Sequence, residues 1–287
     1  MSFINNLTKK DVVITSDDIM FEQPLNEQMR LCLRLEHLFQ QIEYHFDKDS
    51  MWDTRIVMNV LFDIVTVLDR PDLKNKLGQT LNQYIAALMQ LEQIPSVNKQ
   101  KLRRMIDQLN KAMDALHAMQ GKVGQVLREN EFLIALQQRL SIPAGTCGFS
   151  SPAYHLWLHL PLKARFKNLL HWCEPLEPLQ KIISLLLKLT RDSTELKPKI
   201  AKAGFYQANL DSNIAYQMIR IQVPLKYELY PEISVGRHRL TIHFFELNPK
   251  GKANQTKKDV DFSLACCKLR VKEDQQSSAA QQETSED

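Results

Sequence analysis

The sequence has few glycines and no apolar run long enough to cross a membrane. Only eight of the 287 residues are glycine, and they never form the glycine-rich turn that cradles phosphate in P-loop and Rossmann folds. The longest stretch without Asp, Glu, Lys or Arg, residues 140–162, is interrupted by prolines and glycines. It cannot supply the roughly 20 consecutive apolar residues of a membrane helix. These absences argue against a nucleotide-binding fold and against a membrane span.

Cysteine is also scarce and irregularly placed. The five cysteines form no CxxC pair and no zinc-ligand spacing, and Cys266 directly precedes Cys267, so their side chains would point to opposite faces of a strand. The first residues lack the apolar core of a signal peptide. We therefore expect free thiols and a cytoplasmic protein.

No catalytic motif is assembled in the chain. His155 and His159 have the i, i+4 spacing of a zincin, but Leu156 occupies the position where that motif needs a glutamate. No serine lies in a GxSxG turn. We expect neither an enzyme nor a metal or other cofactor. The simpler interpretation is a short buried helix with the two histidines at its rim, anchored by Leu156, Trp157, Leu158 and Leu160.

The charge is unevenly distributed although the formal net charge is only +4. The last fifteen residues, 273–287, contain acidic residues and no basic ones. Residues 237–272 are basic, with three acidic residues against Arg237, Arg239, Lys250, Lys252, Lys257, Lys258, Lys268, Arg270 and Lys272. Either an anionic partner or an ordinary solvated surface explains this excess.

From residue 25 to about residue 191, apolar residues recur every three or four positions, which is typical of buried helix faces. Four long segments, separated near Pro71 and Pro95, have the length and short connections of antiparallel neighbours in a bundle. Shorter helices are expected at 123–140, 152–160, 162–172 and 176–191.

After Pro198 the pattern changes to short runs of branched and aromatic residues. Strands are predicted at 215–223, 225–230, 237–247 and 260–271, with an exposed hairpin loop at 248–258. The segments 11–14 and 19–21 also look extended, and we expect them to pair with this sheet. The fold class is therefore α+β, a helical bundle domain with a smaller antiparallel β domain. The expected limits are an N-terminal strand segment (1–24), a helical domain (25–195), the β domain (196–271) and a disordered acidic tail (272–287).

The predicted strand at 237–247 has two different faces. Alternation places Arg237, Arg239, Thr241 and His243 on one face and His238, Leu240, Ile242 and Phe244 on the other. This pattern suits either a sheet that binds a partner on its basic side or a plain half-exposed strand.

Several long motifs resemble the ZapD family of FtsZ-associated proteins. They are 21–30 (FEQPLNEQMR) with 33–36, 139–145 (RLSIPAG) continuing to 156–161, 204–207, 229–234 (LYPEIS) and 261–267 (DFSLACC). Together they extend from about Phe21 to Cys267. Family members usually stop near the paired cysteines, so the resemblance does not address the segment from Lys268 onward.

The resemblance implies a cytoplasmic homodimer at the division site that binds the C-terminal tail of FtsZ and bundles its filaments, supporting Z-ring assembly and septation. It also implies basic residues in a cleft between the domains. Carried over by position, these are Arg70, Arg128, His155 and Arg239, with Arg237 and His243 on the same strand. Glu131 and His243 stand where the family has a basic residue and a stronger cation, which weakens the expected contacts there.

Two other functions remain open on the sequence alone. A nucleic-acid-binding protein could use the basic stretch 237–272, although no RNP-like strand, helix-turn-helix or zinc module is visible. An enzyme with an unrecognised site would need a closed pocket with perturbed titratable groups, which a sequence cannot reveal.

Overall fold

The computed structural model describes residues 17–95, 97–119 and 121–269. Within these ranges the chain forms helices between residues 27 and 192 and strands at 18–24 and 197–268. The predicted α+β class is confirmed, including an N-terminal strand that pairs with the later ones. The extended segment at 11–14 and the acidic tail predicted for 272–287 lie outside the described residues. The predicted domain limits stay a prediction.

The helices of the described ranges lie close to the predicted ones. They are α2 (Glu27–His45), α3 (Met51–Val67), α4 (Leu73–Leu91), α5 (Lys99–Ala118), α6 (Gln125–Arg128), α7 (Glu131–Leu140), α8 (Pro152–Leu158), α9 (Leu162–Cys173) and α10 (Glu177–Asp192), with a 3₁₀ turn, η1 (Glu174–Leu176), before the last.

The single helix predicted at 123–140 is wrong, because the segment forms two helices, α6 and α7. Gly124 enters α6 with φ 75°, a left-handed conformation that glycine adopts without a steric penalty. Asn130 caps α7, since its side-chain oxygen accepts a hydrogen bond from the Leu133 amide at 3.1 Å. An N-cap residue lies outside the helix that it begins, so the helical conformation is interrupted at Asn130.

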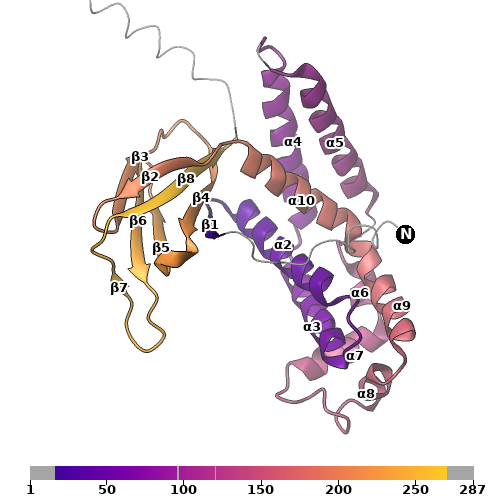
Figure 1. Ribbon diagram of the computed structural model, residues 1–287. Helices are drawn as coiled ribbons and strands as arrows, with labels where there is room; N and C mark the ends of the chain where they lie inside the picture. The colour runs from indigo at the N-terminus through magenta and orange to yellow at the C-terminus, as the bar shows by residue number, and fades with distance from the viewer. Residues whose placement is uncertain (1–16, 96, 120, 270–287) are drawn as a thin grey trace, which may run out of the picture. The chain divides into compact units, whose positions relative to one another are not determined.

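Helices α4 and α5 form an antiparallel pair (Figure 1). Near the start of α4, Lys74 Nζ donates a hydrogen bond to the carbonyl of Met119 at 2.6 Å, just beyond the end of α5. Close to the other end of the pair, Arg103 Nε lies 3.4 Å from Glu92 Oε1. These contacts confirm the predicted antiparallel arrangement for these two helices.

The described residues divide into two compact units. One holds residues 30–81 and 110–187, and the other holds residues 17–29, 82–109 and 188–269.

In the first unit, the buried Arg165 fixes the start of α9 against neighbouring elements. Its side chain is 6% exposed, and its guanidinium donates to Thr54 Oγ1 on α3 at 2.5 Å and to the Asp49 carbonyl at 3.0 Å. Its Nε donates to the carbonyl of Leu160, just after α8, at 3.1 Å. A buried cation is tolerated only when its donors are satisfied. Arg165 therefore holds α8 in place.

The strands of the described ranges belong to the second unit. They are β1 (Asp18–Pro24), β2 (Lys197–Ala201), β3 (Phe205–Asn209), β4 (Tyr216–Pro224), β5 (Leu229–Val235), β6 (Arg239–Glu246), β7 (Asn254–Gln255) and β8 (Val260–Lys268), with a 3₁₀ turn, η2 (Leu225–Tyr227), between β4 and β5. They form sheet A, in the order β1-β4-β8-β2, and sheet B, in the order β3-β6-β5 with β7 also on β6. Every pairing is antiparallel.

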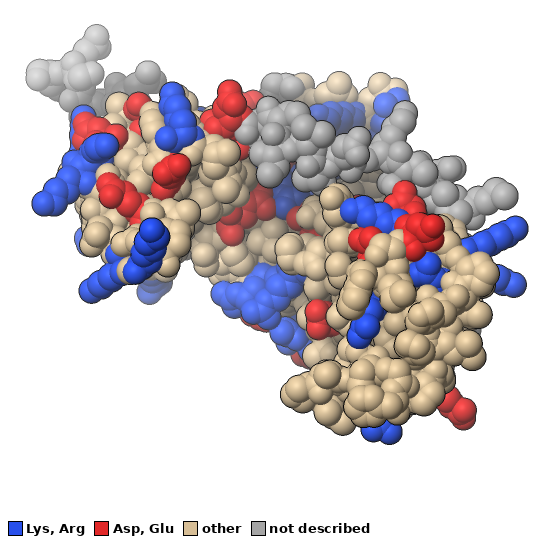
Figure 2. Space-filling view, turned by 60° about the horizontal axis from the view of Figure 1, so that its bottom comes forward, with Lys and Arg blue, Asp and Glu red and all other residues tan. Residues whose placement is uncertain are grey.

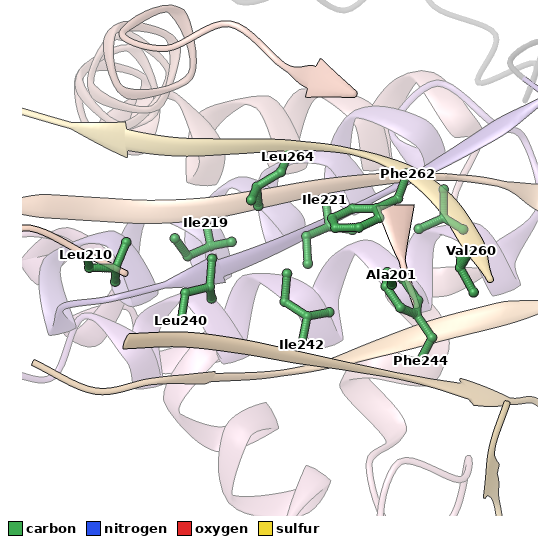
Figure 3. Packing of buried hydrophobic residues seen from close by; sticks show 11 residues of the cluster. Ala201, Leu210, Ile219, Ile221, Leu240, Ile242, Phe244, Val260, Phe262 and Leu264 are labelled. Atoms are coloured by element: carbon green, nitrogen blue, oxygen red, sulfur yellow. The ribbon is translucent and has the colours of Figure 1, made fainter. Parts of the chain in front are cut away.

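The two sheets enclose one apolar core (Figure 3). Ile219, Ile221 and Leu264 from sheet A point toward Leu240 and Ile242 from sheet B. All five are buried. Alternation along each strand puts these residues on the inner faces and leaves every second residue for the outer faces.

The connections between the sheets differ from the prediction. Residues 225–230 were expected to form a strand, but Leu225–Tyr227 is a 3₁₀ turn and Glu228 has φ 52°. The chain must turn there because β4 belongs to sheet A and β5 to sheet B. The hairpin predicted across residues 248–258 is also wrong, since β6 and β8 lie in different sheets and the chain first returns along β6 as β7.

A partly buried ion-pair cluster joins β1, β4 and α10 in the second unit. Glu22 on β1 accepts hydrogen bonds from Arg220 Nε at 2.9 Å and from Arg191 Nε and a terminal nitrogen at 2.9 and 2.6 Å. Glu22 is directly opposite Arg220 in the β1–β4 register. One carboxylate thus pairs with two arginines and attaches the N-terminal strand to its neighbours.

Candidate partner-binding site

Strand β6 confirms the predicted two-faced pattern from Arg239 onward. Leu240, Ile242 and Phe244 are fully buried in the core, whereas Arg239 is exposed and His243 is half-buried on the opposite face. The exposed side of β6 and its neighbours β3 and β5 is called the outer face of sheet B below.

Arg237 and His238 do not belong to this alternation. They lie in the turn between β5 and β6, which is closed by a hydrogen bond from the Gly236 amide to the Arg239 carbonyl at 2.8 Å. Both side chains are exposed. The prediction that His238 points into the core with Leu240 is therefore wrong, because the strand begins only at Arg239.

Aromatic side chains accompany Arg239 on the outer face of sheet B. Phe205, opposite His243 in the register, has its ring centroid 5.0 Å from the imidazole and is 39% exposed. Tyr230 and Phe245, also opposite each other, stack at 5.8 Å. The face thus offers a guanidinium and accessible rings on one rigid surface. Sequence reasoning missed these rings. Their position on the outer face follows from the two-residue period of each strand once the register between the strands is known.

His243 is held by the edge of the same sheet. Its Nδ1, in the tautomer that carries the proton there, donates a hydrogen bond to Oε1 of Gln255 on β7 at 3.1 Å. Glu232 on β5 is the register partner of His243. The carboxylate makes this part of the face less cationic than the part around Arg239.

Arg70 and Arg128 both lie near the C-terminal end of α3 in the first unit. Arg70 is exposed in the turn that follows α3, and its charge, after the hydrogen bond from Lys76, helps to hold the pKa of Asp72 below its usual value. Arg128 donates from one terminal nitrogen to the Val123 carbonyl at 2.7 Å and from the other to the Val65 carbonyl at 3.3 Å. Arg128 therefore caps α3 as well as carrying charge.

His155 lies exposed on α8, also in the first unit. Its ring is 4.4 Å from that of His159 and packs beside Gly148, where an added Cβ would lie only 3.2 Å from Nδ1. The structure thus places three of the predicted site residues in one unit and Arg237, Arg239 and His243 in the other. Arg70 and Arg128 lie near the same end of α3, whereas Arg239 and His243 share a face of β6 but are roughly 14 Å apart along the strand.

The surroundings of α8 expose apolar side chains that sequence reasoning placed inside. Trp157 and Leu158 are buried as predicted, but Leu156 is 66% and Leu160 36% exposed, so the anchoring role expected of these two residues is wrong. Phe149 in the preceding loop is 88% exposed. Trp52 at the start of α3 is 66% exposed and lies under the Arg55 guanidinium, whose other ring contact is Tyr154 on α8. Phe149, Leu156 and Trp52 are called the α8 apolar cluster below.

One face of the molecule shows how charged and uncharged surfaces are distributed (Figure 2). Lys and Arg side chains are interspersed with Asp and Glu, and one broad area carries no charged side chain.

Further properties of the described ranges concern metals, membranes and thiols. No three His, Cys, Asp or Glu residues there are grouped to hold a metal ion. None of the helices in these ranges combines the length and apolar character required to cross a membrane. The five cysteines are free, as predicted, and burial raises the pKa of Cys32 and of Cys173 to about 12.

These features define a class: an α+β protein whose exposed cationic and aromatic side chains are suited to binding a partner. The sequence profile of the ZapD family, a cell division protein, matches residues 33–243. The protein from Coxiella burnetii named cell division protein ZapD is 41% identical over 253 residues, covering 88% of this chain and 98% of that protein. Those of the same name from Methylococcus capsulatus and Chromobacterium violaceum are 35% and 36% identical and cover 88% of this chain and 99% and 100% of their own length.

The chain therefore belongs to the ZapD family of cell division proteins.

Proposed function

We propose that this protein binds the C-terminal tail of FtsZ and, as a homodimer, cross-links FtsZ filaments in the cytoplasm at the division site. The observation that carries the proposal is the outer face of sheet B, which presents the exposed Arg239 at one end of β6 and the accessible ring of Phe205 and the stacked pair Tyr230 and Phe245 toward the other end, roughly 14–20 Å along the strand. Membership of a cell division family supports the same role.

A short flexible peptide with carboxylates and a few apolar side chains fits this face chemically. A guanidinium can bind a carboxylate through two parallel hydrogen bonds. The rings of Phe205, Tyr230 and Phe245 can cover apolar side chains of the peptide. A flexible tail loses conformational entropy when it binds, so the affinity of one site should be modest. No catalytic step is required.

The remaining predicted residues are proposed as further contacts of the tail. Arg237 and His243 extend the outer face of sheet B in the two directions along β6. In the first unit, Arg70 and His155 are exposed, whereas Arg128 already uses two of its donors on carbonyl groups. We therefore expect Arg70 and His155 to contribute more directly than Arg128.

The α8 apolar cluster is the surface we propose for pairing two copies of the chain. Phe149, Leu156 and Trp52 are large and mostly exposed, and burying them against the same cluster of a second copy would remove apolar area from water. A dimer presents two tail-binding faces. Because a filament displays many tails, binding of the first raises the effective concentration for the second.

The fold weakens the case for nucleic-acid binding. The basic stretch at 237–272 is not one surface: Arg239 begins β6, whereas Lys250 and Lys252 follow its other end, roughly 24 Å away along the strand. A steep, sequence-independent loss of any nucleic-acid binding with salt would indicate only general charge attraction.

Co-sedimentation with polymerised FtsZ tests the proposal. The protein should pellet with FtsZ and increase the bundled fraction, and FtsZ lacking its C-terminal tail should show neither effect. Equal pelleting with and without the tail would contradict the proposed binding mode, and failure to bundle intact filaments would contradict the function.

A further inference from the structure

The described chain ends at the same end of the sandwich as Arg239. Lys268, the last residue of β8, pairs with Tyr216 at the start of β4, and the Leu269 amide donates to the Ala215 carbonyl at 3.2 Å. Six residues earlier in sequence than Ala215, Asn209 pairs with Arg239. The short loop 210–215 therefore separates the end of β8 from the start of β6.

A hydrogen bond fixes this loop to the turn before β6. The Leu210 amide donates to the His238 carbonyl at 2.9 Å, and the Leu210 side chain is buried in the sandwich core. Six extended residues span at most about 20 Å, and the strand-to-strand steps from Leu269 to Ala215 and from Asn209 to Arg239 add about 5 Å each. The point where the chain leaves β8 therefore lies within about 30 Å of the Arg237–Arg239 turn.

The remaining chain is long enough to cover that distance. Residues 270–287 could span about 60 Å if fully extended. The acidic residues of this segment are Glu273, Asp274, Glu283, Glu286 and Asp287, so carboxylates occur both near its beginning and at its end. Because the extended length of the segment exceeds the distance to the Arg237–Arg239 turn, some of these carboxylates can reach the outer face of sheet B.

Charge complementarity favours the Arg237–Arg239 turn over the lysines of the loop after β6. Both guanidinium-bearing residues are exposed there. The lysines of the loop after β6 lie at the far end of the strand. Segment 273–287 has no basic residue and no apolar residue larger than alanine. Its attraction to the turn would therefore be almost purely electrostatic.

We propose that the acidic segment 273–287 folds back onto the Arg237–Arg239 end of sheet B and competes there with an anionic peptide. This inference rests on the proposed function, because the peptide it excludes is the tail of FtsZ. The tether gives the segment an effective concentration of order millimolar, which compensates for weak electrostatic contacts. The FtsZ tail, which also carries apolar side chains, displaces it when many tails are presented together.

A charge-neutralised full chain tests the competition. In this variant Glu273, Glu283 and Glu286 become Gln and Asp274 and Asp287 become Asn. Calorimetry with an FtsZ tail peptide at low salt should show about 3–10-fold tighter binding to the variant than to the unchanged chain, since the competitor has lost its charge. The difference should shrink at about 1 M salt, where the screening length is about 3 Å. Equal affinities at low salt would overturn the inference.

A second titration tests the contact without FtsZ. A fluorescent synthetic peptide of sequence 273–287 should bind the neutralised chain weakly and lose that binding with Arg239→Glu. Lys250→Glu, which makes the same charge change at the other end of β6, should retain it. If the peptide binds all variants equally or none of them, the proposed contact is wrong. If the FtsZ peptide binds neither chain, the proposed function fails, and this titration still decides the inference.

Discussion

Four arginines of the described residues fall into two groups with different environments. Arg165 and Arg128 donate to carbonyl oxygens within their own unit, and Arg165 is buried. Arg239 and Arg237 are exposed near the edge of the sandwich. Arg239 and Arg237 can bind a partner without giving up an internal hydrogen bond, whereas Arg165 and Arg128 cannot. Mutation of the exposed pair should therefore change binding, and mutation of the other pair should change stability.

Arg239→Glu should weaken binding of an FtsZ tail peptide by at least about tenfold, because a bidentate charge-assisted contact becomes a like-charge repulsion. The fold should remain intact, since the side chain is exposed. Calorimetry and circular dichroism measure the two properties. Lys250→Glu is the matched control and should change the affinity by less than about twofold. Unchanged affinity of Arg239→Glu would remove this residue from the site.

Arg128→Ala should lower the free energy of unfolding by about 1–3 kcal/mol, because the Val123 and Val65 carbonyls lose their charged donor. Chemical denaturation measures the change. Arg139, exposed at the end of α7, provides a control, and its replacement by Ala should cost less than about 0.5 kcal/mol. Equal stability of the two variants would show that the cap of α3 contributes nothing.

At the scale of elements, the register of β6 decides which side chains share the outer face of sheet B. Phe205 lies beside His243, and Tyr230 beside Phe245, only because β3 and β5 pair with β6 in these registers. Where the chain passes from sheet A to sheet B, it also needs residues that can adopt a left-handed backbone conformation. Gly204, between β2 and β3, has φ 70°, and an added Cβ would lie 2.4 Å from the Thr256 carbonyl oxygen.

Glu22→Ala should destabilise the second unit by about 2–4 kcal/mol, because it leaves Arg191 and Arg220 partly buried without their shared carboxylate. Thermal or chemical unfolding followed by circular dichroism tests this value. The exposed pair of Lys76 and Asp72 on α4 and its preceding turn gives a control. Lys76→Ala should cost at most about 0.5 kcal/mol, and a similar cost for Glu22→Ala would mean that the cluster does not hold β1.

At the scale of the whole molecule, the proposed function requires two copies. Binding one tail needs only one outer face of sheet B, whereas joining two filaments needs a second face in the same particle. Bundling and peptide binding should therefore separate when the dimer is weakened.

Phe149→Ser combined with Leu156→Ser should shift the protein from dimer to monomer, because the pair removes most of the apolar area of the α8 cluster. Light scattering after size exclusion measures the mass, and sedimentation with FtsZ measures bundling. We expect bundling to be lost while the double variant still binds the tail peptide, and adding Arg239→Glu should still weaken that binding by at least about tenfold. A monomer that still bundles filaments would contradict the model of two faces, and an unchanged dimer would place its interface elsewhere.

The sequence predicted the helices better than the strands, since β2, β3, β7 and most of β5 were not expected. The 3.6-residue period located the long helices, and alternation located the buried side of β6. It failed at Asn130, where a cap ends one predicted helix, and at Leu225, where the chain turns from sheet A to sheet B. It failed again at Leu156, because a short helix between loops can expose an apolar residue that periodicity assigns to the core.

What the sequence determined by itself was the α+β class, the free cysteines, the two-faced strand around Arg239 and the motifs that place the chain in its family. These depend on local spacing or on direct comparison. Only the tertiary structure decided that the basic stretch 237–272 divides between two ends of β6, that Arg128 caps a helix, and that β8 ends near the Arg237–Arg239 turn. Those facts depend on pairing between residues far apart in the chain. Such long-range contacts produce no periodic pattern of apolar residues, so they cannot be recognised from the sequence.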